Sequence, residues 1–276
     1  MAIVTWTGTT SGDWNTGTNW STGSVPGSSD TVIFNGSSKT ISGTSIPAVA
    51  EIKILDGFTG SFGVKGGNLD VDATTVFIKS PTAPVFISGD FTTVIVTDND
   101  GTADSINIGS NSNITSLRYL GGAGTVTLEG STLTNLEVIG TPRGIVSIPS
   151  TGPAVTTITM DSGQINTSAN VTTANISGGE MTVKGTANLT TANIRGKSVV
   201  SFESSGTLTT ANVFDKPSVL TLENNVSAGA TLTDVNLYDG TLDDRSGSGA
   251  TTYTNGVSVR GQGIVRADVN RTLVVT

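Results

Sequence analysis

A six-residue pattern recurs at a nearly constant spacing, and it constrains the fold more than any other feature of the chain. It reads VTTANI at 171–176, returns as LTTANI at 189–194, 18 residues later, and returns as LTTANV at 208–213, after a further 19 residues. Self-similarity with a period near 20 residues is typical of a solenoid, in which short structural repeats stack on one another. The chain is therefore expected to form a stack of rungs.

A relaxed form of the pattern, with apolar residues at the first, fourth and sixth positions, extends in both directions. The upstream sets are Val49, Ile52 and Ile54; Ala73, Val76 and Ile78; Phe91, Val94 and Val96; Ile114, Leu117 and Tyr119; Leu133, Leu136 and Val138; and Val155, Ile158 and Met160. The downstream sets are Leu232, Val235 and Leu237, and then Thr254, Val257 and Val259. The average spacing stays near 20 residues, which predicts about 10 to 11 rungs.

Each copy is followed by a second short apolar run that ends at Gly, Ser, Asp or Pro. Examples are Met181–Val183, Val199–Phe202 and Val219–Leu222. These runs are rich in β-branched residues, and nothing between them has the period of a helix. The predicted fold class is therefore all-β: a single-stranded parallel β-helix with rungs of about 20 residues. We expect the solenoid to span residues 46–260.

Strand alternation places the fourth and sixth residues of the pattern on one face, with the first residue out of phase. A corner is therefore expected at the Thr-Thr pair, and two inward ladders are expected beyond it. The ladders are Ile176, Ile194, Val213 and Leu237, and Ala174, Ala192 and Ala211. Between them lie Asn175, Asn193, Asn212 and Asn236. The favoured interpretation of these four is an outward ladder of amide hydrogen bonds between rungs, and the alternative is a row that binds a glycan.

Composition excludes several classes of function. The net charge of −8 argues against a nucleic-acid-binding face and against an anionic membrane surface. No window of about 18 apolar residues is present, so no membrane insertion is expected. The chain has no Cys and no His, which removes disulfides, thiolate or imidazole metal ligands, and catalysis by Ser-His-Asp or Cys-His. No cofactor is expected beyond the calcium ion considered below.

Residues 1–45 differ from the repeats and hold all three tryptophans, Trp6, Trp14 and Trp20. The surrounding Gly, Ser, Thr and Asn indicate turns, which lead into a strand at 31–34. A solenoid needs an atypical terminal unit to cover its open apolar end, and three indoles would supply that cover. The favoured interpretation is therefore an N-terminal cap or attachment segment. The alternative is an exposed aromatic platform for a sugar or a partner.

This N-terminal segment resembles the start of β-helical proteins of bacteriophage particles and of some bacterial surface and autotransporter-like proteins. The resemblance rests on Trp6-x-Gly8, Asp13-Trp14-Asn15, Asn19-Trp20-Ser21, Val25-Pro26 and the run 30–34, so it covers roughly the first 35 positions. The repeats behind it are similar to pectin-lyase-like proteins in period and strand pattern. The resemblance implies a β-solenoid, while its function remains open because the fold carries adhesins, enzymes and virion parts alike.

Two acidic turns are candidate sites. Asp98, Asp100 and Asp104 alternate around Gly101, which suits a Ca²⁺ ion, although an ordinary Asp/Asn turn is favoured because the EF-hand spacing and its late Glu are missing. Asp243 and Asp244 precede Arg245. Paired carboxylates serve glycoside hydrolysis, but the sequence places no second acid opposite them.

These observations predict a non-enzymatic structural protein of a bacteriophage virion: a capsid decoration, head fibre or spike component. The alternatives are a bacterial surface adhesin and a tail-spike polysaccharide depolymerase. No secretory signal is recognised at the start, which suits a protein that reaches its place by assembly and lysis. The expected partners are two further copies in a homotrimer, virion proteins such as the major capsid protein, and a host surface glycan. Residues 261–276 are expected to form a C-terminal strand or arm.

Overall fold

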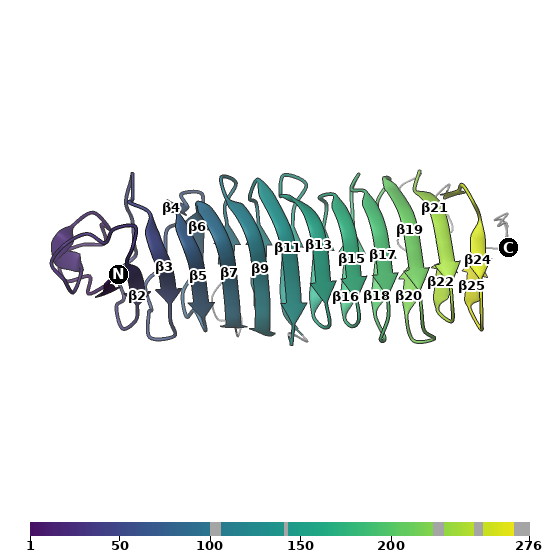
Figure 1. The fold of residues 1–276 in the computed structure, drawn as a ribbon, viewed down its shortest axis with the longest axis horizontal. Coiled ribbons are helices and arrows are strands. Elements are labelled where there is room, and N and C mark those ends of the chain that lie inside the picture. Colours follow the sequence, from purple (N-terminus) through teal and green to yellow (C-terminus); the bar gives the residue numbers. More distant parts are fainter. Residues whose placement is uncertain (100–105, 141–142, 223–228, 246–250, 268–276) are drawn as a thin grey trace. The chain divides into compact units, whose positions relative to one another are not determined.

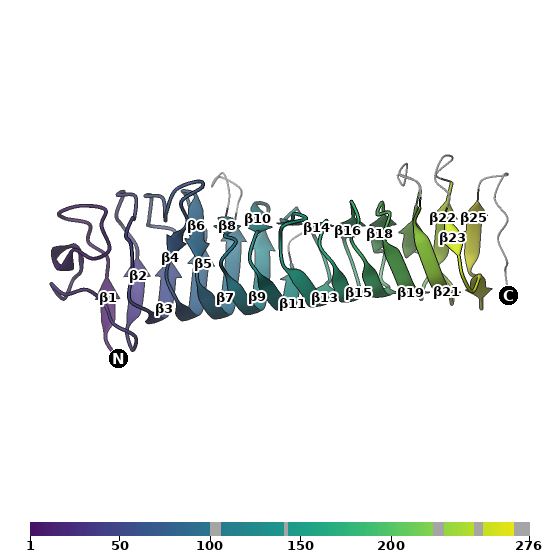
Figure 2. The ribbon, with the colours of Figure 1, turned by 90° about the horizontal axis from the view of Figure 1, so that it is seen from above.

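The computed structural model describes residues 1–99, 106–140, 143–222, 229–245 and 251–267. It confirms the predicted fold class: the chain is an all-β parallel β-solenoid of about 11 rungs, with about 20 residues in each rung. From β3 onward the strands alternate between two sheets, and in most rungs the strand in the first sheet is longer than the strand in the second (Figures 1 and 2).

The chain divides into two compact units. The N-terminal unit comprises residues 1–134 and 143–147, and the C-terminal unit comprises residues 135–142 and 148–276. Strand β11 (Thr132–Ile139) has residues in both units, and β12 (Ile145–Ile148) belongs to the N-terminal unit except for its last residue.

In the N-terminal unit the longer strands run in the order β1-β2-β3-β5-β7-β9, and the shorter strands in the order β4-β6-β8-β10-β12. The longer strands are β1 (Ile3–Thr5), β2 (Thr31–Phe34), β3 (Val49–Ile54), β5 (Ala73–Lys79), β7 (Asp90–Asn99) and β9 (Asn113–Gly122). The shorter strands are β4 (Leu69–Asp70), β6 (Val85–Ser88), β8 (Ile106–Ile108) and β10 (Thr125–Leu128). A single 3-10 turn, η1 (Gly17–Asn19), lies in the N-terminal loops.

In the C-terminal unit the longer strands run in the order β13-β15-β17-β19-β21-β23, and β24 also pairs with β21. The shorter strands run in the order β14-β16-β18-β20-β22-β25. The longer strands are β13 (Ala154–Met160), β15 (Val171–Ile176), β17 (Leu189–Ile194), β19 (Thr207–Val213), β21 (Thr231–Leu237), β23 (Thr252–Tyr253) and β24 (Val257–Val259). The shorter strands are β14 (Gln164–Thr167), β16 (Glu180–Val183), β18 (Val199–Phe202), β20 (Val219–Thr221), β22 (Thr241–Asp244) and β25 (Ile264–Ala267).

The six-residue pattern is a burial pattern. In β15 the first, fourth and sixth residues are buried, and Thr172 and Thr173 both face outward. The register from β15 to β17 pairs Val171 with Leu189 and then resumes at Thr173, so the strict alternation of a strand is interrupted at the Thr pair, where the corner was expected. The same interruption recurs in β17. Two consecutive outward residues turn the strand while both flanking parts keep their apolar side chains in the core.

The two predicted inward ladders are present in the core of the C-terminal unit. Ile176 pairs with Ile194 and Ile194 with Val213, while Ala174, Ala192 and Ala211 pair in the same register. All six of these side chains are at most 1% exposed. Small Ala beside larger branched residues fills the narrow space between the two sheets without voids.

The last repeat differs from the prediction in one position. Tyr253, and not Thr254, pairs with Leu232 of the preceding rung, while Val257 and Val259 pair with Val235 and Leu237 as the spacing predicts. Thr254 is exposed. One extra residue therefore separates the first and fourth positions in this rung, which is why the longer strand is divided into β23 and β24. Thr254 fits the first position of the relaxed pattern, so the sequence alone does not reveal the inserted residue.

The two sheets also include strands outside residues 46–260. Strand β1 pairs in parallel with β2, and β2 with β3, so the sheet reaches into the segment 1–45. The Asp30 carboxylate accepts hydrogen bonds from the backbone N–H groups of Ala2, at 2.9 Å, and Gly27, at 3.0 Å, and these bonds lower the pKa of Asp30. At the other end, β25 pairs with β22 and so adds residues 264–267 to the second sheet.

Among the described residues, none of the helical structure has the length and apolar character that a membrane-spanning helix requires.

The ladder predicts a sharp contrast between neighbouring residues. Ile194→Asp places an unpaired charge at a fully buried position, so we expect the protein to unfold or to lose at least about 3 kcal/mol of stability. Asn193→Ala removes the two amide bonds of a half-buried side chain and should cost only about 1–2 kcal/mol. Thermal and urea unfolding monitored by circular dichroism would measure both. Equal, small losses would show that the assigned inward and outward faces are reversed.

Candidate functional site

The N-terminal unit contains a buried aromatic cluster. Trp6, Trp14 and Trp20 are each at most 2% exposed. Trp20 packs edge-to-face against the other two indoles, with ring centroids 4.9 Å and 4.8 Å apart. All three surround Phe34 on β2, which in turn contacts Phe62 at 5.0 Å. The tryptophans are thus continuous with the core of the first rungs. No open ring face remains for a sugar, so this geometry favours the cap over the exposed platform.

Asn19 organises the loops that hold these indoles. Its side-chain oxygen accepts hydrogen bonds from the backbone N–H groups of Thr10 and Ser11, at 2.9 Å and 3.0 Å. Its amide nitrogen donates to the Ser11 hydroxyl and to the Asp13 carbonyl. The side chain is fully buried and uses both of its polar atoms. Sequence reasoning noted Asn19 only as part of the Asn-Trp-Ser motif and missed this role.

The predicted calcium turn is only partly described. Asp98 lies in β7 with a positive φ of 52°, and its carboxylate accepts a hydrogen bond of 3.0 Å from the Thr97 hydroxyl. Asp100 and Asp104 lie outside the described residues. Within the described ranges, no three acidic side chains are grouped so that they could hold a metal ion. The calcium site stays a prediction.

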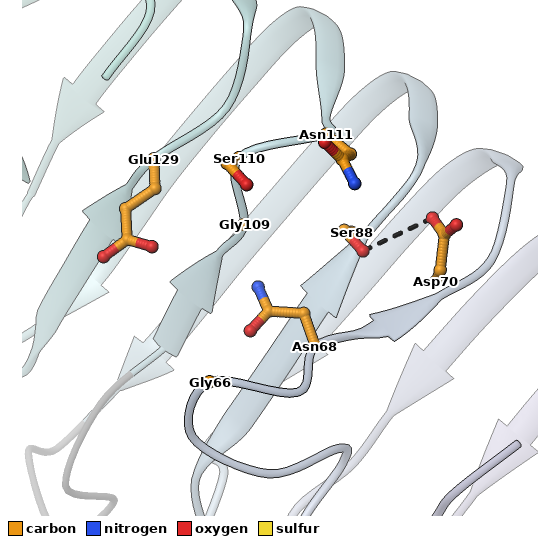
Figure 3. A pocket seen from close by; sticks show the side chains of 8 residues that line it. All are labelled: Gly66, Asn68, Asp70, Ser88, Gly109, Ser110, Asn111 and Glu129. Carbon is orange, nitrogen blue, oxygen red and sulfur yellow. Dashed lines mark hydrogen bonds between the residues drawn. The ribbon is translucent and has the colours of Figure 1, made fainter. Parts of the chain in front are cut away.

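A polar groove of about 280 Å³ lies in the N-terminal unit, where the shorter strands β4, β6, β8 and β10 end (Figure 3). Its lining residues are Gly66, Asn68, Asp70, Ser88, Gly109, Ser110, Asn111 and Glu129. The hydroxyl of Ser88 donates to the Asp70 carboxylate at 3.3 Å. Figure 3 shows Glu129 on the far side of the groove from Asp70. Hydroxyl, amide and carboxylate groups around an open groove suit a hydroxyl-rich ligand such as a saccharide.

Two residues of this groove have a structural role. The Asn68 amide donates to the carbonyl of Ile87 at 3.3 Å and to the Asn107 side chain at 3.0 Å. A Cβ atom at Gly109 would lie 2.0 Å from the Asn68 amide nitrogen, so only glycine permits this approach. By contrast, the side chains of Asn111 and Glu129 make no hydrogen bond within the part of the chain that the structure describes. They are the groups that remain available to a ligand.

The two acidic side chains at the end of β22 have different partners. Asp243 accepts two hydrogen bonds from Arg245, at 2.7 Å and 2.6 Å, and Arg266 lies 3.5 Å away. Asp244 is fully buried and accepts a bond of 2.9 Å from the Tyr253 hydroxyl. The hydrogen bond from Arg245 is the largest cause that lowers the pKa of Asp243, and burial opposes it. A general acid needs a raised pKa, so this site favours structure over catalysis.

The four asparagines form the predicted hydrogen-bonded ladder. Asn193 donates to Asn175 at 2.9 Å, Asn212 to Asn193 at 2.9 Å, and Asn236 to Asn212 at 3.0 Å. These amides therefore bind one another along the C-terminal unit, as the favoured interpretation expected.

A second surface ladder was missed by sequence reasoning. Arg195, Phe214, Tyr238 and Arg260 directly follow the sixth position of the pattern in consecutive rungs, which is a signal that the sequence contains. The Arg195 guanidinium lies 4.0 Å from the centre of the Phe214 ring. The Phe214 and Tyr238 rings stack at 4.9 Å with an angle of 4°, and the Arg260 guanidinium lies 5.8 Å from the Tyr238 ring. We call these four residues the cation–aromatic ladder.

Comparisons with protein-family models, with curated proteins and with solved structures give no match for this chain.

The Asp243 pair predicts a pH dependence of stability. Because folding lowers the pKa of Asp243, its ionised form stabilises the fold above the ordinary value of about 3.9. That contribution is lost as the pH falls through the lower folded pKa. Asp243→Asn should therefore be less stable than the wild type at pH 7, and the difference should shrink below about pH 4.

Urea unfolding between pH 7 and pH 3 would measure this effect. Asp56→Asn is the matched control, because Asp56 is exposed and its carboxylate has no hydrogen bond or ion pair among the described residues. A stability difference between Asp243→Asn and the wild type that stays constant over the whole range would contradict the assignment.

Proposed function

We propose that this chain is a non-enzymatic structural component of a bacteriophage particle, such as a capsid decoration, a head fibre or a spike protein. The observation that carries the proposal is that the repeated positions are used for contacts between rungs. In the described part of the C-terminal unit the Ile, Ala and Asn ladders all serve contacts between rungs. The resemblance of residues 1–35 to β-helical virion proteins supplies the viral part of the proposal.

A solenoid suits a structural role for a physical reason. Each rung contacts only its neighbours, so stability accumulates along the stack and does not depend on a single central core. The Asp30 hydrogen bonds and the buried tryptophans supply further anchoring in the first rungs. Such a stack can display a surface at a distance from an attachment point, which is what a decoration or a spike requires.

The outward Thr pairs support a role in assembly. Thr172 and Thr173 face outward on β15, and Thr190 and Thr191 do the same on β17. An uncharged wall of this kind loses little charge solvation when it packs against another protein. We therefore include other virion proteins, such as the major capsid protein, and further copies of this chain among the proposed partners, with the virion as the location.

Particles provide the direct test. An antibody raised against this chain should label purified virions in electron micrographs, and the chain should co-sediment with intact particles. Labelling confined to the surface of the host bacterium would favour the adhesin alternative instead. A chain present in the lysate but absent from washed particles would contradict the proposal.

The homo-oligomer is tested separately. We expect a closed trimer, because cyclic symmetry buries the uncharged walls without producing open filaments, and the three-fold choice follows the resemblance to phage fibres. Light scattering of the purified chain should give about three times the 28.0 kDa mass of one chain. A well-folded monomer at tens of micromolar would remove the trimer and leave assembly to the particle.

The polar groove allows a test of the alternative that the chain is a polysaccharide depolymerase. Asp70 and Glu129 line it, and glycoside hydrolysis uses two carboxylates across a sugar-binding site. Sustained release of reducing sugar from a host polysaccharide, abolished by Glu129→Gln but not by the control Glu137→Gln on β11, would replace the structural proposal with an enzymatic one. Both variants remove one carboxylate from the N-terminal half of the sequence.

A further inference from the structure

The cation–aromatic ladder gathers positive charge in a chain that is acidic as a whole. The turns at 195–198, 214–218, 238–240 and 260–263 hold Arg195, Lys197, Lys216 and Arg260 but only two acids, Asp215 and Asp239. The chain as a whole carries a net charge of −8. The positive charge of these turns is therefore local and does not follow from the composition of the whole chain.

The two acids in these turns are engaged by the backbone. The Asp215 carboxylate accepts a hydrogen bond of 2.8 Å from the Gly196 N–H and another from the Ser218 hydroxyl. The Asp239 carboxylate accepts one of 2.7 Å from the N–H of Gln262. They fix the turns between rungs and form no ion pair with either arginine among the described residues.

Aromatic rings hold the Arg195 and Arg260 side chains in place, but the guanidinium N–H groups bind no described residue. Both side chains are exposed, and each guanidinium lies over an aromatic ring. Within the described part of the chain, neither one makes a hydrogen bond or an ion pair. A guanidinium over a ring keeps its in-plane N–H groups clear of that ring, so the donors stay available to an oxygen ligand. Stacking also reduces the entropy that each side chain loses when it binds.

Spacing identifies the class of ligand. Arg195 and Arg260 are three strand spacings apart, which is about 14 Å along the rungs. Double-stranded DNA would present about eight phosphate charges over that length, far more than two guanidiniums and two ammonium groups can neutralise. A carboxylated polysaccharide carries its charges farther apart and offers hydroxyl groups between them. The Phe214 and Tyr238 rings lie between the two arginines.

We propose that the cation–aromatic ladder is a binding site for an acidic polysaccharide that lies along the rungs. The carboxylates of the glycan bind the guanidiniums of Arg195 and Arg260, and Phe214 and Tyr238 hold those guanidiniums in place. Lys197 and Lys216 add attraction at longer range. The site does not depend on the proposed virion role, and an adhesin could use it equally.

Polygalacturonate oligosaccharides are the probe, with neutral dextran, dextran sulfate and monomeric galacturonate for comparison. Calorimetric titration of the full chain should show binding to polygalacturonate, none to dextran, and weakening as salt is added. Monomeric galacturonate should bind at least about tenfold more weakly, because it cannot reach both arginines. Equal binding of dextran, or of the monomer, would overturn the proposal. Tighter binding of dextran sulfate would identify sulfate as the preferred group at the same site.

Variants locate the site. Arg195→Gln with Arg260→Gln should lower the affinity at least about tenfold, since two charge-assisted contacts are lost. Lys39→Gln with Lys65→Gln removes the same net charge from exposed positions elsewhere and should change the affinity by less than about twofold. Phe214→Leu keeps both charges and should cost an intermediate amount, because Arg195 loses the ring over which it lies.

The outcomes separate clearly. Equal losses in the two double variants would mean attraction by net charge alone and would overturn the site. Unchanged affinity in the Arg195 and Arg260 double variant would do the same. Circular dichroism melting curves must match those of the wild type, so that a loss of binding reports the site and not the fold. If DNA displaces polygalacturonate at an equal concentration of negative charge, the cation–aromatic ladder would be a nucleic-acid site instead.

Discussion

Parallel hydrogen bonding in register between rungs is the constraint on which the rest of this structure depends. Val171 pairs with Leu189, and Leu189 with Leu208, so each position of one rung lies against the same position of the next. The backbone N–H and C=O groups of an inner rung are satisfied by its two neighbours. Any residue type that repeats in the sequence therefore becomes a ladder in space. The interior ladders supply burial, and the exterior ladders determine what the surface presents.

This constraint explains what the sequence could reveal. The hexapeptide at 171–176 predicted the fold, the two inward ladders and the Asn ladder because each depends only on position within the repeat. Features that depend on loops were not accessible in the same way. The hydrogen bonds of Asn19 join residues of the N-terminal loops, which lie outside the repeat. The shift from Thr254 to Tyr253 escaped because one inserted residue leaves the apolar pattern nearly unchanged.

The N-terminal segment does not follow the repeat rule, although β1 still pairs in parallel with β2. The chain responds with an irregular segment. Trp6, Trp14 and Trp20 enclose Phe34 of β2, and their large apolar surface is buried. The indole nitrogens of Trp6 and Trp14 are buried without a hydrogen-bond partner among the described residues. Both indoles pack edge-to-face against Trp20.

The two exterior ladders of the C-terminal unit differ in a way that bears on function. In the Asn ladder an inner amide such as Asn193 donates to one neighbour and accepts from the other, so a ligand would have to replace bonds that already exist. In the cation–aromatic ladder the contacts are made through ring and guanidinium faces, and the N–H edges of Arg195 and Arg260 stay free of bonds to described residues. A ladder of like amides satisfies itself, whereas one that ends in cations retains capacity to bind an anion. Binding can therefore be added at one surface position of a rung without disturbing the bonds that hold the rungs together.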